Sequence, residues 1–144
     1  MDKGLRRTLI LDADPDTLIT LQHVLEEAEI DATITWDKTE ACQLIETTPF
    51  DLILIGHHPP ELNAAAIVDN LSLRGTCPPV LILMGIFGDK DAEYFCRVGA
   101  VGVIPKRDPL AVLEQVTKAL TPVHFNAKAA MAGLTEARRW PTAS

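Results

Sequence analysis

Residues Asp51 to Pro60 read DLILIGHHPP and give the clearest indication of the fold. Its first half contains Leu52–Ile55, a run of aliphatic residues typical of a central strand in a parallel sheet covered on both faces. The run ends at Gly56, and two histidines and two prolines follow it. We therefore predict a buried strand whose carboxyl end opens into a loop.

Four further apolar runs, each followed by a stretch of helical period, lie on either side of this strand in the sequence. They are Thr8–Leu11, Ala32–Trp36, Val80–Met84 and Val101–Ile104. In the second of the five runs, apolar and threonine side chains alternate, as in a half-covered edge strand. Successive βα units with short loops predict an α/β fold of the flavodoxin-like type, a doubly wound parallel sheet of order 2-1-3-4-5. Ligands of such sheets bind at the carboxyl ends of the first and third strands.

The predicted helices have recognisable starts and apolar faces. Asp14-Pro15 and Asp108-Pro109 each place an N-cap acceptor before a proline suited to the first helical position. In the fourth helix, the residues expected to face the core are Ala92, Phe95 and Cys96.

Length and composition indicate one domain. The chain has 144 residues, of which 47% are hydrophobic and 23% are charged, and this excludes a disordered or collagen-like protein. We expect a domain at residues 1–120 and a tail at 121–144. No apolar run approaches the roughly 18 residues of a membrane helix, and the N-terminus lacks a signal-peptide core. A cytoplasmic protein without a membrane partner is expected.

Charge and cysteine content narrow the function classes. The net charge of -7 leaves no global basic surface, so no nucleic-acid partner is expected. Cys42, Cys77 and Cys96 are odd in number and lack paired spacing, which predicts reduced thiols and neither disulfides nor zinc ligands.

Three stretches carry a family resemblance. Leu11–Pro15 reads LDADP, Asp51–Pro60 covers the third strand and its loop, and Val98–Lys106 reads VGAVGVIPK. Together they resemble the acidic turn, the phosphoacceptor loop and the lysine segment of bacterial response-regulator receiver domains, the CheY-like superfamily. The resemblance extends from about Arg7 to Leu120. It implies a place in two-component signal transduction.

In that family a phosphoryl group moves to an aspartate, helped by magnesium, a hydroxyl and a lysine, which neutralise the developing charge. The resemblance places the phosphoacceptor at Gly56, which has no side chain, and the second acid of the metal-binding turn at Ala13. The hydroxyl residue falls on Met84, and the aromatic that reports the phosphorylated state falls on Val103.

Three charged residues of the pocket remain. Asp12 and Lys106 match the family, and Asp14 occupies a position that the family fills variably. We expect Asp12 and Lys106 to form a salt bridge, because a partly buried carboxylate needs a cation. His57 and His58 lie nearby, but neighbours in an extended loop point in opposite directions and cannot easily hold one ion. No metal or other cofactor is therefore predicted.

The resemblance implies a degenerate pseudo-receiver that is not an enzyme. Its expected role is phosphorylation-independent binding of a signalling protein or of a second copy in a homodimer. The expected interface is the face of the fourth helix, fifth strand and fifth helix, which the family commonly uses, with Tyr94 and Val98 partly exposed on it. Two alternatives remain open: a sensor that binds a small ligand or ion in the emptied pocket, and a phosphoswitch with Asp12 or Asp14 as an atypical acceptor.

The tail has its own pattern. Ala127, Ala130, Met131 and Leu134 recur at helical spacing, which predicts a short helix that packs on the domain or on a second copy. A disordered linker end is the alternative.

Overall fold

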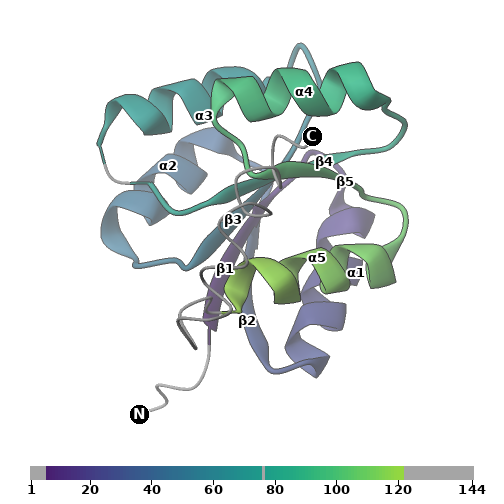
Figure 1. Cartoon of the computed structure of the whole chain (residues 1–144). Coiled ribbons are helices and arrows are strands. Elements are labelled where there is room, and N and C mark those ends of the chain that lie inside the picture. Colours follow the sequence, from purple (N-terminus) through teal and green to yellow (C-terminus); the bar gives the residue numbers. More distant parts are fainter. Residues whose placement is uncertain (1–5, 76, 122–144) are drawn as a thin grey trace, which may run out of the picture.

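Five parallel strands form one sheet in the computed structural model, which describes residues 6–75 and 77–121 (Figure 1). The strand order is β2-β1-β3-β4-β5, so the predicted flavodoxin-like α/β fold is confirmed. The central strands are buried because helices cover both faces of the sheet, and every residue of β3 is buried. The strands are β1 (Arg6–Leu11), β2 (Ile30–Thr35), β3 (Leu52–Gly56), β4 (Val80–Met84) and β5 (Gly102–Pro105).

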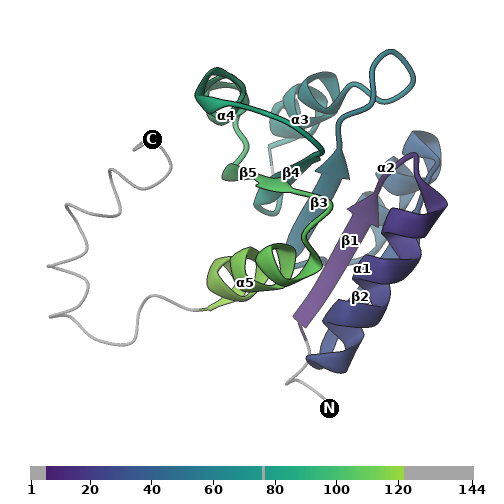
Figure 2. The same cartoon turned by 90° about the vertical axis from the view of Figure 1, so that its right-hand side faces the viewer.

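Five helices cover the two faces of this sheet in the described residues (Figures 1 and 2). α1 (Pro15–Glu27) and α5 (Pro109–Leu120) pack on one face. The other face is covered by α2 (Lys38–Thr47), α3 (Ala64–Leu73) and α4 (Asp89–Val98). The predicted N-caps are confirmed, since the carboxylates of Asp14 and Asp108 accept backbone N–H groups at the starts of α1 and α5.

The prediction for the inner face of α4 is right for one residue and wrong for two. Phe95 is buried in the core, whereas Ala92 and Cys96 are half-buried and line a groove along β5. The physical reason is that β5 is the edge strand of the sheet, so part of the apolar face of α4 extends past it.

The second strand is an edge strand, as predicted, but it lies earlier in the chain than its alternation suggested. It begins at Ile30 and ends at Thr35, and Trp36 lies beyond it with 69% of its surface exposed. The three cysteines are free thiols. In the described part of the chain, every helix is too short or too polar to cross a membrane. The predicted tail helix at residues 127–134 lies outside the described residues.

Candidate functional site

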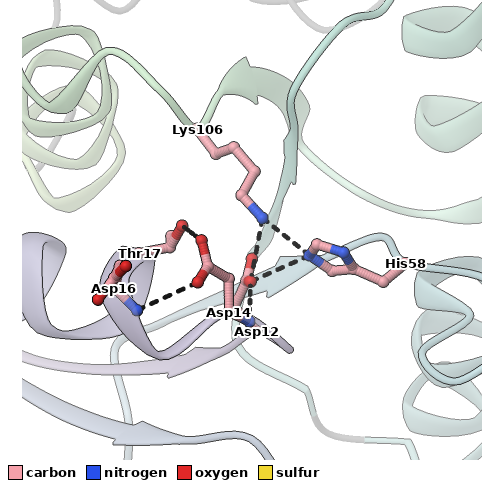
Figure 3. Close-up of polar contacts among 6 residues, drawn as sticks. All are labelled: Asp12, Asp14, Asp16, Thr17, His58 and Lys106. Carbon is pink, nitrogen blue, oxygen red and sulfur yellow. Dashed lines mark hydrogen bonds and ion pairs between the residues drawn. The ribbon is translucent and has the colours of Figure 1, made fainter.

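Asp12 is the centre of the candidate site at the carboxyl edge of the sheet. It follows β1 directly, and its side chain is completely buried. Its Oδ1 atom accepts hydrogen bonds from the backbone N–H of Asp14 at 2.8 Å and from Nζ of Lys106 at 3.0 Å (Figure 3). Lys106 follows β5, and its side chain is only 9% exposed. The predicted salt bridge between Asp12 and Lys106 is therefore confirmed.

His58 joins this pair, a contact that the sequence reasoning missed. Its Nε2 atom lies 3.0 Å from Oδ1 of Asp12 and 2.8 Å from Nζ of Lys106 (Figure 3). The backbone N–H and C=O of His58 both bond to Leu62 at 2.8 Å, which closes the loop after β3 and fixes the start of the His58 side chain. The only signal in the sequence is a histidine two residues beyond the end of a central strand.

The three side chains of Asp12, His58 and Lys106, here called the Asp12 cluster, cannot satisfy all their contacts in one protonation state. Nε2 of His58 either carries a hydrogen and donates to Asp12 or carries a lone pair and accepts from Lys106. Lys106, whose Nζ lies 3.0 Å from Oδ1 of Asp12, is the basic partner of the buried carboxylate. The cation that balances the buried carboxylate is thus part of the protein itself.

Gly56 lies beside Asp12 at the end of β3 and explains how the carboxylate fits there. A Cβ atom at position 56 would lie 2.0 Å from Oδ2 of Asp12 and 2.7 Å from its Cγ, far inside van der Waals contact. Oδ2 is buried and has no hydrogen-bond partner among the described residues. The carboxylate of Asp12 therefore fills the space that a side chain at position 56 needs.

The remaining predicted pocket positions lie around the Asp12 cluster. Ala13 is exposed and offers no polar side-chain atom, and Met84 packs against the core. Val103 also packs against the core and lines the groove along β5 instead of this pocket. The carboxylate of Asp14 accepts a hydrogen bond from the hydroxyl of Thr17 at 2.8 Å, and this bond lowers the pKa of Asp14.

His57 points away from its neighbour, as the sequence predicted. Its Nδ1 atom accepts a hydrogen bond of 3.2 Å from the backbone N–H of Ala64, which is the first residue of α3. Its ring meets Phe95 edge-on, with the ring centroids 5.1 Å apart. Burial lowers the pKa of His57, the charge of His58 acts in the same direction, and Asp91 opposes them. His57 is thus a structural acceptor for α3 and is not directed at Asp12.

An open cavity of about 480 Å³ lies above the Asp12 cluster, within the size range of small-molecule sites. Asp14 and Asp16 line it from the start of α1, whereas Lys106 and Arg107 line it from the segment after β5. The two walls thus carry opposite charges.

Among solved structures, receiver domains of response regulators share the fold described above. The receiver domain of the Francisella response regulator 1452 is 23% identical, with a TM-score of 0.74 over 80% of this chain and 96% of that one. CheY4, a chemotaxis response regulator of Vibrio cholerae, is 20% identical, with a TM-score of 0.74 over 81% and 99% of the two chains. A CheY-like receiver domain protein of Methanospirillum hungatei JF-1 is 22% identical, with a TM-score of 0.71 over 81% and 94%. No family model and no curated protein matches the sequence.

The residues present at the site do not fit the magnesium ion that receiver domains use. Magnesium requires near-octahedral oxygen ligands, usually including carboxylates. Here Oδ1 of Asp12 is engaged by three nitrogen atoms, and neither Ala13 nor Gly56 has a side-chain oxygen. In the described ranges, no three or more His, Cys, Asp or Glu side chains converge as metal ligands.

Proposed function

We propose that this protein is a pseudo-receiver that takes up no phosphate and acts as a protein-protein interaction module in bacterial two-component signalling. The observation that carries the proposal is the position of the Asp12 carboxylate over Gly56. Phosphoryl transfer to a receiver needs a nucleophile, a metal ion and a cation placed around the phosphoryl group. Here the nucleophile position has no side chain, and the cation Lys106 is already paired with Asp12.

Asp12 and Asp14, the two carboxylates named above as atypical acceptors, are poor substitutes for the missing aspartate. Asp12 is completely buried, and its Oδ1 atom already has three polar neighbours. Asp14 caps α1 and accepts the hydroxyl of Thr17, a pair of contacts that phosphorylation would break. We therefore favour the interaction module over a phosphoswitch with an atypical acceptor.

A phosphorylation assay tests the loss of phosphoryl transfer. We expect no acid-labile gain of a phosphoryl mass after incubation with acetyl phosphate and magnesium, and no binding of beryllofluoride. A receiver domain with an aspartate at the acceptor position, treated in parallel, serves as the positive control. Stoichiometric labelling at Asp12 or Asp14 would make the protein a phosphoswitch and refute the proposal.

The proposed interaction surface is the face formed by α4, β5 and α5. Tyr94 on α4 is 48% exposed, and its ring lies edge-on to that of the buried Phe95. It is on the flank of α4 opposite the groove-lining Ala92 and Cys96, so the proposed surface includes this outer flank of α4. Val98 is half-buried and packs against the core, so it supports the surface more than it projects from it. An exposed aromatic side chain is a favourable interface anchor.

A pair of aromatic substitutions tests this surface. Tyr94→Ala should weaken partner binding about 30-fold, the effect of losing an anchor worth about 2 kcal/mol. Trp36→Ala is the matched control, because Trp36 is also an exposed aromatic but follows β2, at the opposite edge of the sheet. Binding is measured with the partner captured from the native host. Undiminished binding by a folded Tyr94→Ala protein would move the interface elsewhere.

A sensor of a small ligand or ion is the second candidate function, and the cavity with its oppositely charged walls supports it. A thermal-shift screen with metals, nucleotides and acetyl phosphate separates the two functions. A reproducible rise in melting temperature with one compound would favour the sensor, because a ligand that binds only the folded state stabilises it.

A further inference from the structure

A second hollow, of about 360 Å³, lies along the outer edge of β5 between α4 and α5. We call it the β5 groove. β5 ends the sheet, so its outer edge pairs with no other strand in the described structure. The side chains that line the groove include Ala92, Cys96, Val103, Ala111 and Gln115, and polar and apolar atoms contribute about equally to its exposed wall. An open strand edge is a surface that proteins usually cover.

We propose that the chain's own C-terminal segment, residues 122–144, docks in the β5 groove. α5 runs from the carboxyl edge of the sheet to Leu120, and the segment continues from there. Gln115, the last residue of α5 that lines the groove, lies about 8 Å along the helix axis from Leu120. A chain that turns back after Thr121 therefore enters the groove within a few residues.

The segment contains apolar residues that suit the apolar side chains of the groove. Ala130, Met131 and Leu134 form part of an apolar stripe at helical spacing. If residues 124–136 are helical, they span about 20 Å, enough to run back along the whole of α5, whose 12 residues span about 18 Å. The small and flexible side chains of this stripe suit a shallow groove between two helices.

Charge complementarity sets the direction in which the segment lies. The segment carries Lys128, Arg138 and Arg139 against one acid, Glu136, although the whole chain has a net charge of -7. A segment that runs antiparallel to α5 moves toward the carboxyl edge of the sheet, where α4 begins. The first turn of α4 is acidic, with Asp89 and Asp91, so the two arginines arrive beside opposite charges.

Docking would make the segment a competitor for the interaction face. The β5 groove is part of the α4, β5 and α5 face, so a partner that binds there must first displace residues 122–144. This regulatory consequence rests on the proposed function, whereas the docking itself does not. The test below therefore uses the full chain with no partner present.

Cys96 is a built-in probe, because it lines the β5 groove and is half-buried. We compare its rate of alkylation by N-ethylmaleimide in three full-length proteins, at one pH because burial raises the pKa of this thiol. The three proteins are the native chain, the double variant Met131→Asp with Leu134→Asp, and the control double variant Ala129→Asp with Ala132→Asp. The control adds the same charge to the opposite side of the predicted helix.

The native chain and the control should react slowly, and the Met131 and Leu134 variant about tenfold faster, as expected when a covering segment is bound about nine-tenths of the time. Cys42 and Cys77 lie outside the groove lining and should keep their rates in all three proteins. Equal Cys96 rates in the three proteins would overturn the proposal. The proposal would also be overturned if the Met131/Leu134 variant and the control were accelerated equally, or if all three cysteines reacted faster. In neither case would the faster reaction report release of the apolar face of the segment.

Protein concentration separates the chain's own segment from a second copy. Docking within one chain makes the Cys96 rate independent of protein concentration, whereas protection that grows with concentration would assign the groove to a second copy and overturn the proposal. Loss of partner binding in Tyr94→Ala is measured separately. The Cys96 rate therefore reports docking of the segment, and the Tyr94→Ala assay reports the partner interface, so failure of one is distinguishable from failure of the other.

Discussion

Gly56→Ala should destabilise the native protein and have little effect once Asp12 is replaced by alanine. In the native chain, the new Cβ would lie 2.0 Å from Oδ2 of Asp12, so the carboxylate has to move. When it moves, Oδ1 loses its contacts with Lys106 and His58. Overpacking costs about 1–3 kcal/mol, and the disturbed ion pair places the expected loss near the upper end, about 3 kcal/mol.

The same substitution meets a different environment in the Asp12→Ala background. The two closest atoms, Oδ2 and Cγ of Asp12, are then gone, and only the Cβ of residue 12 remains close, at 3.3 Å. Alanine in place of a strand glycine gains about 0.5–1 kcal/mol, which offsets this tight contact. The two positions should therefore show a coupling free energy of about 2–3 kcal/mol.

Urea unfolding of the four proteins, followed by far-UV circular dichroism at neutral pH, measures this cycle. With a slope of about 2 kcal/mol per molar urea, the midpoint should fall by about 1.5 M for Gly56→Ala in the native chain. It should change by less than about 0.3 M in the Asp12→Ala background. Equal losses in the two backgrounds would show that the Asp12 carboxylate does not occupy the space next to Gly56.

Three further predictions concern the same edge of the sheet. Lys106→Met should lower the free energy of unfolding in urea by about 3 kcal/mol, because it leaves Asp12 buried without its cation. The double variant Lys106→Met with Asp12→Asn should recover most of that loss. An unchanged urea midpoint in Lys106→Met would contradict the ion pair. The lowered pKa of His57 means that the folded state binds fewer protons than the unfolded state, so stability should fall as pH drops below about 6.5 toward the folded-state pKa. His57→Asn, which keeps an acceptor for Ala64, should reduce this slope in unfolding measured across that pH range, and an equal slope contradicts the assignment. Gly56→Asp alone should give no rapid magnesium-dependent labelling by acetyl phosphate, because Asp12 fills the space and Ala13 and Met84 supply no oxygen; rapid labelling contradicts this account.

The fold was predictable because the central strands show their burial in the sequence. The runs Leu52–Ile55 and Val80–Met84 are apolar without interruption, which is typical of strands covered on both faces. The wrong prediction that Ala92 and Cys96 of α4 are buried in the core also came from the apolar pattern. A pattern of apolar positions shows which side of a helix is apolar, but Ala92 and Cys96 line a groove because β5 is the last strand.

The candidate site was predictable where it depends on strand ends and unpredictable where it depends on side-chain placement. Asp12 and Lys106 follow β1 and β5, so parallel topology brings them to one edge. The contact of His58 depends on how its loop closes against Leu62, a pairing that no local pattern encodes. The position of the Asp12 carboxylate over Gly56 depends on an absent side chain, and the sequence shows this absence but not which group fills the space.

The Asp12 cluster also bears on where a ligand or partner can act on this protein. Its members come from the ends of β1 and β5 and from the loop after β3, and they hold these segments together with charges that the protein supplies itself. A ligand that acts through this edge must separate Lys106 from a completely buried carboxylate, a change that costs about 3–5 kcal/mol unless the ligand replaces the cation. A ligand of the β5 groove meets half-buried apolar side chains and an open strand edge, and no buried ion pair has to break. We therefore expect regulation at the α4, β5 and α5 face, with the Asp12 cluster as a fixed support that keeps β5 in one position.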